Sequence, residues 1–199
     1  MRTTALRWAR ATWFGVLAAL VLSACTPYTF RGATLEPPDQ AFDFTLTDQN
    51  GQPFSLAEQR GNVVLLFFGY TNCPDICPAT LSDMQLVLNR LGDQANNVRM
   101  VFITVDPERD TVEKLQRFTA RFDERIVGLT GDSQQLVAVY QAYGAGATRR
   151  ELPNSALKYA MDHTATTTVI DKTGQRRLLF GFGSPVEDMT SDIQALLNE

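Results

Sequence analysis

The stretch Phe68-Gly69-Tyr70-Thr71-Asn72-Cys73-Pro74-Asp75-Ile76-Cys77-Pro78 decides the fold of this chain. It follows an apolar run at residues 62–67, whose β-branched and aromatic side chains predict a buried strand. From residue 79 onward the apolar side chains recur at helical spacing, as Leu81, Met84, Leu88 and Leu91. The two cysteines therefore lie at a strand-to-helix junction, where free backbone N–H groups and the helix dipole favour thiolate over thiol.

The spacing of the two cysteines bears on what they do. A C-x-x-C pair before a helix is typical of a thioredoxin-type redox site. Cys73 and Cys77 instead form C-x-x-x-C, which places their sulfurs one helical turn apart and suits two ligands that converge on one ion. Metal binding and thiol–disulfide exchange both remain open at this point, because thiolate is the reactive form in each.

The third cysteine, Cys25, belongs to a different segment. Residues 1–24 combine a basic start, an apolar stretch and Leu22-Ser23-Ala24 directly before Cys25. This pattern is typical of a bacterial lipoprotein signal peptide, so we expect cleavage before Cys25 and lipid attachment to it. A membrane-spanning helix is the alternative, although the apolar run falls short of the ~20 residues that a bilayer core requires. Either interpretation tethers the rest of the chain to a membrane outside the cytoplasm, in the periplasm or on the outer face of the cell membrane.

The composition is that of one ordinary soluble domain beyond this tether. With 44% hydrophobic and 20% charged residues, a chain of 199 residues can bury a substantial core without disulfides. Removing residues 1–24 takes away three arginines and no acidic residue, so the formal net charge goes from -4 to -7. An acidic domain is repelled by phosphate backbones and attracted to basic surfaces, which argues against nucleic acid as a partner.

The segments before the cysteine stretch predict a linker and a hairpin. Residues 26–41 lack a period and contain three prolines, so residues 25–41 are interpreted as the lipidated cysteine and a flexible linker, and residues 42–199 as the folded domain. Residues 42–47 alternate between apolar and polar side chains, and Asn50-Gly51 then leads to residues 53–56. This pattern predicts an N-terminal β-hairpin with a tight turn.

The segments after the cysteine stretch predict an α/β domain. The helix from residue 79 leads to a second core strand at residues 98–105, and a right-handed crossover makes the two strands parallel. A helix is predicted over residues 111–122, capped by Asp110 with Glu113 completing a capping box. A strand at 126–129 and a helix at 132–143 follow. Residues 144–161 predict a long irregular loop, and the chain closes with strands at 166–171 and 176–182 and a helix at 186–197.

The single histidine, His163, lies just before the strand predicted at residues 166–171. In a sheet of this order that position faces the cysteine loop, so one imidazole can meet two thiolates. A lone histidine is more often structural than a ligand, but the cysteine pair favours metal binding. Two thiolates and one imidazole match Cu(I) and can accept a weak oxygen donor for Cu(II), whereas structural zinc would want a fourth strong ligand. The sequence therefore predicts a copper site formed by Cys73, Cys77 and His163.

These motifs resemble those of the Sco/SenC family of copper-binding assembly proteins for cytochrome c oxidase. Residues 69–78 are similar to the family's signature, residues 105–111 to its second motif and residues 159–164 to its third, so the resemblance covers most of the chain. It implies a thioredoxin-like fold with an added N-terminal β-hairpin and a copper ion held by Cys73, Cys77 and His163. It also implies delivery of copper or reducing equivalents to the copper-site subunit of cytochrome c oxidase. Other periplasmic copper chaperones or thiol reductants are further expected partners.

Two other functions compete with this one. A membrane-tethered thiol–disulfide oxidoreductase would use Cys73 and Cys77 as a redox pair without metal. Such a protein does not need His163 and usually has a proline at that point, which residues 162–164 lack. A thiol peroxidase would carry a proline and a threonine seven and three residues before its reactive cysteine, where this chain has Leu66 and Tyr70. We therefore expect mainly a metallochaperone, with thiol–disulfide reductase activity as a possible second role.

Overall fold

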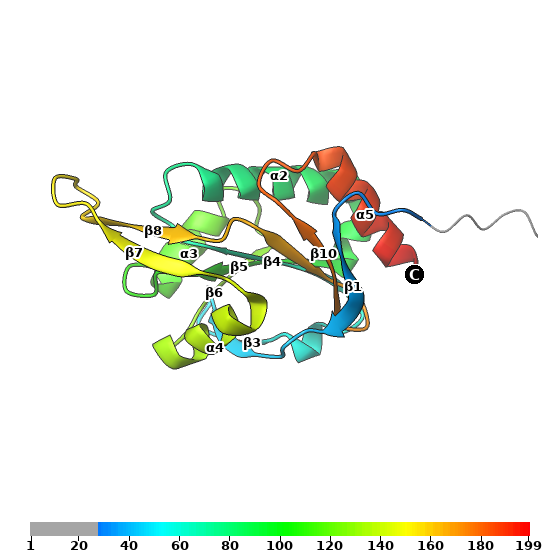
Figure 1. Cartoon of the computed structure of the whole chain (residues 1–199), viewed down its shortest axis with the longest axis horizontal. Helices are drawn as coiled ribbons and strands as arrows, with labels where there is room; N and C mark the ends of the chain where they lie inside the picture. The colour runs from blue at the N-terminus through cyan, green and yellow to red at the C-terminus, as the bar shows by residue number, and fades with distance from the viewer. Residues whose placement is uncertain (1–27) are drawn as a thin grey trace, which may run out of the picture.

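A mixed β-sheet forms the centre of the molecule in a computed structural model that describes residues 28–199 (Figure 1). The sheet has eight strands in the order β1-β10-β9-β4-β5-β6-β2-β3. Its strands are β1 (Ala33–Gln40), β2 (Thr45–Asp48), β3 (Pro53–Ser55), β4 (Val63–Gly69), β5 (Val98–Thr104), β6 (Ile126–Thr130), β9 (Thr167–Ile170) and β10 (Gln175–Phe180).

The core is built around β4, in which every residue is buried. β4 pairs in parallel with β5, from Val63 opposite Val98 to Gly69 opposite Thr104, and β5 pairs in parallel with β6. On its other side β4 pairs with β9 in the antiparallel sense. Because both faces of β4 are covered, its sequence is continuously apolar instead of alternating, as expected for a central strand of an α/β sheet.

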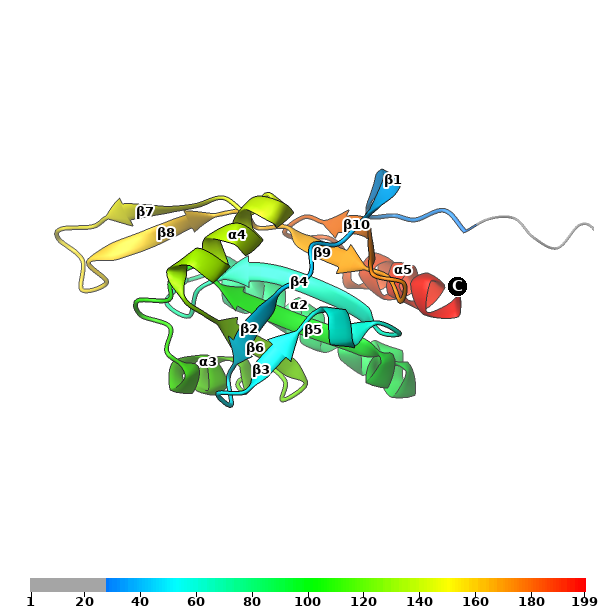
Figure 2. The ribbon, with the colours of Figure 1, turned by 90° about the horizontal axis from the view of Figure 1, so that it is seen from below.

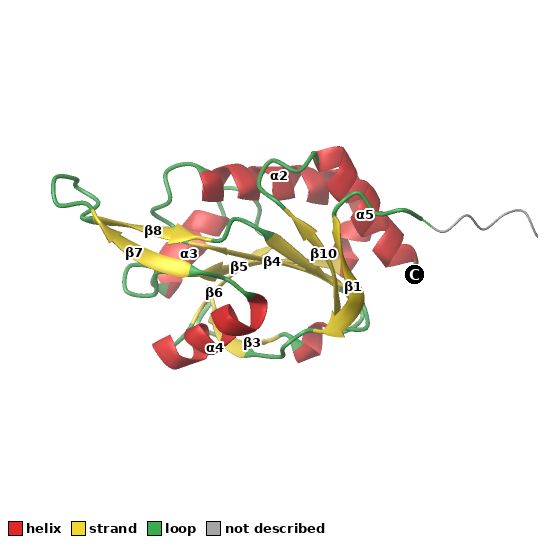
Figure 3. Cartoon of the chain, viewed as in Figure 1, coloured by secondary structure: helices red, strands yellow, loops and turns green. Residues whose placement is uncertain are grey.

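Helices cover both faces of the sheet (Figure 3). On one face α2 (Ile76–Leu91) packs against α5 (Val186–Asn198), and α3 (Val112–Thr119) packs on β6. The other face carries α4 (Ser133–Tyr143), where the ring of Tyr140 meets Phe68. Two short 3₁₀ helices, η1 (Ala57–Gln59) and η2 (Gly92–Asn97), complete the connections. The layered α/β architecture and the antiparallel hairpin formed by β2 and β3 confirm the predicted fold class.

A second, two-stranded sheet extends beyond the main one. It consists of β7 (Ala147–Glu151) and β8 (Tyr159–His163), which pair in the antiparallel sense and project from one end of the molecule (Figures 1 and 2). The sequence predicts an irregular loop over residues 144–161, which include most of this hairpin, and that prediction is wrong. Four of the five residues of β7 are exposed, so the segment lacks the buried apolar pattern by which a strand is recognised from sequence.

Two further expectations differ from the structure. The predicted linker includes β1, which pairs with β10 and adds a strand to the edge of the sheet. The cap of α3 is Thr111, whose side chain accepts a hydrogen bond from the backbone N–H of Lys114. Asp110, predicted as this cap, is fully buried and bonds elsewhere.

The predicted signal peptide at residues 1–24 and the lipid site at Cys25 lie outside the described residues. Within residues 28–199, no helix is both long enough and apolar enough to cross a membrane.

Candidate metal centre

The two cysteines lie at the junction of β4 and α2. Cys77 is in the first turn of α2 and is fully buried, whereas Cys73, in the preceding loop, is only partly buried. The backbone N–H of Cys77 points at the Cys73 sulfur, with 3.5 Å between the nitrogen and Sγ. Both thiols are free, so the pair is in its reduced form. A helix N-terminus therefore contributes directly to holding the Cys73 sulfur.

Gly69 gives the Cys77 sulfur room to lie against the end of β4. A Cβ atom at position 69 would be 2.7 Å from the Sγ of Cys77 and 2.7 Å from a ring carbon of Phe102. Both distances are shorter than real carbon contacts allow, so any side chain here would displace the thiol or the core ring. The glycine thus fixes the depth at which the second thiol is buried.

The histidine comes from the opposite side of the site. His163 is the last residue of β8, and its ring packs edge-on against Tyr70 and Phe67, with ring centroids 5.7 and 6.2 Å away. Its Nδ1 is 3.1 Å from the carbonyl oxygen of Thr164. Because a carbonyl oxygen only accepts, Nδ1 carries the hydrogen and Nε2 is the atom left to act as a ligand. Nε2 is 3.5 Å from the Sγ of Cys77.

The three predicted ligands are brought together in space. The two sulfurs and one imidazole nitrogen all lie within 4.8 Å of one another. An ion at the centre of such a triangle is about 2.8 Å or less from each atom, and small rotations of the side chains would reach the ~2.0–2.3 Å of bonds to nitrogen and sulfur. The donor set is soft and three-coordinate, which fits Cu(I) better than structural zinc.

The two thiols are electrostatically unequal. A hydrogen bond from the Cys77 thiol lowers the pKa of Cys73 to about 3, with help from His163 and from the backbone N–H groups of Asp75 and Cys77, although burial opposes the shift. The pKa of Cys77 is raised by its hydrogen bond to Cys73, by burial and by the negative charge of Cys73. Without metal the pair therefore holds one thiolate and one thiol.

The charge on Cys73 also acts on the histidine. Burial alone would lower the pKa of His163, but hydrogen bonds to Cys73 and the Thr164 carbonyl, and the negative charges of Cys73 and Asp162, outweigh it and raise that pKa. A metal ion bound here would displace the proton that Cys73 and Cys77 share. Thiols and imidazoles bind metal only in their deprotonated forms.

A buried carboxylate ties the cysteine loop to the sheet. Asp110 accepts hydrogen bonds from the backbone N–H of Thr71 (3.0 Å) and the hydroxyl of Thr71 (2.6 Å). It also accepts one from the hydroxyl of Thr104, at the end of β5 (2.7 Å). Burial raises the pKa of Asp110, although these hydrogen bonds counteract the shift. The carboxylate thereby fixes the loop two residues before Cys73.

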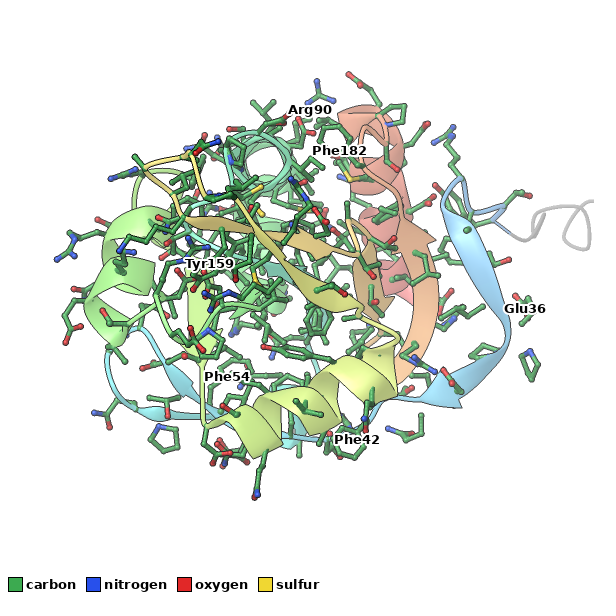
Figure 4. The ribbon with its side chains drawn as sticks, turned by 60° about the vertical axis from the view of Figure 1, so that its left-hand side comes forward. Glu36, Phe42, Phe54, Arg90, Tyr159 and Phe182 are labelled. Atoms are coloured by element: carbon green, nitrogen blue, oxygen red, sulfur yellow. The ribbon has the colours of Figure 1, made fainter. Side chains whose placement is uncertain are left out.

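Arg109, the neighbour of Asp110, holds the hairpin that carries the histidine. Its Nη1 donates to the carbonyl oxygens of Leu157 and Tyr159, both at 3.0 Å, and its Nε pairs with Asp106 at 2.5 Å. The guanidinium carbon lies 3.5 Å from the centre of the Tyr159 ring, and Arg149 covers the same ring at 3.7 Å. The Tyr159 hydroxyl donates to Asp106 at 2.8 Å. The buried side chain of Tyr159, the first residue of β8, is labelled in Figure 4.

An open pocket of about 270 Å³ gives access to the metal centre. Cys73 and His163 form part of its wall, together with Tyr70, Met161 and the exposed ion pair of Arg150 with Asp162. Cys77 does not line it. An approaching partner would therefore meet Cys73 and His163 first, while Cys77 stays covered.

Several supporting residues were not predicted as parts of the site. Residues 105–111 form a recognisable motif, but the sequence predicts no role for Asp106 or Arg109 and predicts Asp110 as a helix cap. The signal in the sequence was the set of Asp106, Arg109 and Asp110 directly after a core strand, which indicates polar contacts at the end of the sheet. Gly69 and Tyr70 lie inside the quoted cysteine stretch, but only the packed structure shows what they touch.

Curated relatives match this chain over much of its length. A family model described as SCO1/SenC matches residues 32–198. A SCO2-like protein of Rickettsia felis is 38% identical over 133 residues, which cover 67% of this chain and 65% of the relative. The mouse mitochondrial SCO2 homologue is 34% identical over 157 residues, which cover 76% of this chain and 60% of the relative. The chain thus spans somewhat less than two thirds of the length of each of these proteins.

Solved structures of similar proteins indicate the same family. Copper-bound ScoI of Bradyrhizobium japonicum is 34% identical and superimposes with a TM-score of 0.74, covering 80% of this chain and all of that one. Apo Sco1 of Thermus thermophilus, also 34% identical, has a TM-score of 0.76 and covers 87% and 100% of the two chains. These matches confirm the thioredoxin-like fold that the resemblance implied. With the family model spanning nearly all of the described residues, the chain belongs to the SCO1/SenC family.

Proposed function

We propose that this protein is a copper metallochaperone that binds one copper ion through Cys73, Cys77 and His163 and delivers it to the dinuclear copper site of cytochrome c oxidase. The observation that carries the proposal is the convergence of two sulfurs and one imidazole nitrogen within 4.8 Å. Copper-bound structures of ScoI from Bradyrhizobium japonicum and of yeast Sco1 support copper as the cargo. The mouse and Rickettsia relatives support the family assignment on which the delivery step rests.

The unequal thiols suit a site that must both hold and release copper. Cys73, as thiolate, and His163 line the open pocket and supply the first donors that an incoming ion meets. Cys77 then loses its proton to the solvent and becomes the third donor, because a thiol binds metal as thiolate. Release to an acceptor reverses these steps, and copper moves as Cu(I) without exchanging an electron with the protein.

A second candidate function is thiol–disulfide exchange with the same cysteine pair. The observation that favours it is the lowered pKa of Cys73, since a partly exposed thiolate is also a nucleophile toward disulfides. A disulfide switch has been identified in BsSco, a member of the Sco family of cytochrome c oxidase assembly proteins that is 25% identical to this chain. His163 distinguishes the two functions, because copper binding uses its nitrogen and thiol exchange does not.

The proposed location is a membrane facing an extracytoplasmic compartment, with Cys25 as a lipid anchor. The basic start, the apolar stretch and Leu22-Ser23-Ala24 directly before Cys25 support this kind of anchor. The partners that we propose are the copper-site subunit of the oxidase and periplasmic copper chaperones or thiol reductants. Mass spectrometry of the protein isolated from membranes tests the anchor: a chain that starts at lipid-modified Cys25 supports it, and retained residues 1–24 contradict it.

The decisive experiment compares His163→Ala with Cys73→Ser and Cys77→Ser. We expect His163→Ala to weaken Cu(I) binding by at least ~10–100-fold, the cost of lesser changes around metal sites, while the two cysteines still cycle between dithiol and disulfide. In cells that lack the wild-type protein, all three variants should then fail to support oxidase assembly at limiting copper. If His163→Ala restores assembly under these conditions while both cysteine variants fail, the oxidoreductase function is the correct one.

A further inference from the structure

A group of three cations lies on α3 and just beyond it, beside the cysteine loop. Lys114, Arg117 and Arg121 follow one another at helical spacing and line a hollow of about 240 Å³. The opposite wall of the hollow consists of Thr71 and Asn72, the two residues directly before Cys73. We call Lys114, Arg117 and Arg121 the cationic patch. α3 and the β7–β8 hairpin lie at the same end of the molecule, far from α5 (Figures 1 and 2).

The cations of the patch have no partner within residues 28–199, a property that only the isolated Lys158 shares with them. Most arginines there form ion pairs with carboxylates, for example Arg31 with Asp188, Arg60 with Asp43 and Arg90 with Glu187. None of the three patch side chains forms an ion pair or donates a side-chain hydrogen bond within the described residues. The nearby acids do not neutralise the patch. The charge of Arg117 is the smallest contribution to the pKa of Glu113, one turn earlier, and Asp110 is buried beneath Thr71.

This arrangement is unfavourable for the isolated protein. Like charges three and four residues apart on a helix repel each other. Lys114 also lies in the first turn of α3, where the positive end of the helix dipole disfavours a cation. The folded domain is acidic overall, with a formal net charge of -7 after residues 1–24 are removed. A concentrated, uncompensated cationic group on an acidic domain is therefore a feature that folding does not explain.

The position of the patch links it to the metal centre. Thr71 and Asn72, which line the hollow, directly precede Cys73 in the chain. Cys73 in turn lines the open pocket of the metal centre. A carboxylate bound in the hollow would lie against the cysteine loop without covering Cys73 or His163. The hollow is thus placed to hold a protein that exchanges copper with the exposed side of the site.

We propose that the cationic patch is the docking surface for an acidic region of the protein that receives copper from this one. The inference rests on the proposed chaperone function and adds the chemistry by which the acceptor is recognised. Carboxylates of the acceptor occupy the hollow between α3 and the cysteine loop, and the attraction raises the rate of encounter. The negative charge of the rest of the domain disfavours other orientations of the same acidic acceptor.

Copper transfer from the full-length, detergent-purified protein tests the docking surface. The probe is the copper-free dinuclear-copper domain of the oxidase subunit, and the variant is Lys114→Gln/Arg117→Gln/Arg121→Gln. The control, Arg31→Gln/Arg60→Gln/Arg90→Gln, removes the same charge elsewhere. We expect the patch variant alone to transfer copper ~10-fold or more slowly at low salt and to lose the salt dependence of the wild type, with unchanged Cu(I) affinity. Equal rates for wild type and patch variant, or equal slowing in the control, would overturn the proposal.

If neither the wild type nor the variants transfer copper, that result counts against the proposed function and not against the docking surface. A second measurement then tests the docking surface by itself. NMR spectra are recorded with a hexa-aspartate peptide and, separately, with inorganic phosphate at the same ionic strength. The peptide should shift the amide signals of Thr71, Asn72 and α3 in the wild type and not in the patch variant. Shifts confined to other surfaces, or equally tight binding of phosphate, would overturn an acidic protein as the occupant.

Discussion

The two walls of the metal centre are held in different ways. The cysteine wall is part of the core: Cys77 is fully buried in α2, and its sulfur rests on Gly69 of β4. The histidine wall is a hairpin that extends beyond the main sheet and brings His163 back across 86 residues of sequence. Adjacent residues anchor the two walls, since Asp110 bonds the cysteine loop and Arg109 bonds the hairpin.

This difference predicts which property each wall controls. Changes at the cysteine wall disturb packing and should appear as lost stability. Changes at the histidine wall alter a few polar and cation–π contacts near the surface, so they should appear mainly as lost metal affinity. Three substitutions test this division.

Gly69→Ala should give the largest effect on stability. The new methyl group would lie 2.7 Å from the Cys77 sulfur and from the Phe102 ring, so the core must shift to accept it. We expect the free energy of unfolding to fall by about 1–3 kcal/mol, measured by urea denaturation of the reduced protein. Gly181→Ala is the matched control, because its methyl group would meet no atom within 4 Å. Equal stability of the two variants would show that the cysteine wall is not held by packing.

Arg109→Lys should mainly affect metal affinity. Lysine keeps the positive charge opposite Asp106 but loses the planar stacking on Tyr159 and at least one of the two carbonyl contacts. We expect Cu(I) affinity to fall ~10-fold, as for other residues that orient a metal ligand, and amide exchange in β7 and β8 to speed up. Arg125→Lys, which alters an ion pair with Asp123, serves as the control. Unchanged affinity in Arg109→Lys would mean that the hairpin is held without this residue.

Asp110 should give the smallest effect, visible as a dependence of stability on pH. Because burial raises its pKa in the folded protein, its contribution is complete below the unfolded pKa and is lost as the pH rises through the folded one. The stability of the wild type relative to Asp110→Asn should therefore fall as the pH rises.

Asp123→Asn provides a control of opposite sign. The hydrogen bond from Arg125 lowers the pKa of Asp123, so the stabilisation by this carboxylate is lost as the pH falls. Urea denaturation across a pH series compares the two variants with the wild type. A pH profile of Asp110→Asn parallel to that of the wild type would contradict the assigned role of the buried carboxylate.

The same contrast explains what could be predicted from the sequence. β4, α2 and β5 carry strong apolar periodicity, and their cysteine junction is local in sequence, so both were predictable. The β7–β8 hairpin is mostly exposed and polar, and it is held by contacts from Arg109, which lies about 50 residues earlier. No local pattern records such contacts. His163 was predicted as a ligand from its position and from the resemblance, but the contacts that position it are visible only in the structure.

Asp110 shows a related limit of sequence patterns. Its position before α3, with Glu113 three residues later, fits a capping box as well as it fits a buried anchor. Thr111 takes the cap instead, and the Asp110 side chain turns inward to Thr71 and Thr104. The choice between two satisfactory hydrogen-bond patterns depends on tertiary neighbours, which the local sequence does not contain.

A Cu(I) competition titration of the dithiol and disulfide forms tests the central claim most directly. A disulfide between Cys73 and Cys77 would remove two of the three donors that lie within 4.8 Å of one another. The protein is titrated with a Cu(I) chelator in each form, with His163→Ala measured alongside. We expect the dithiol wild type to bind one copper ion, His163→Ala to bind it far more weakly, and the disulfide form to bind almost none. Undiminished stoichiometric binding by the disulfide form would contradict the proposed metal centre.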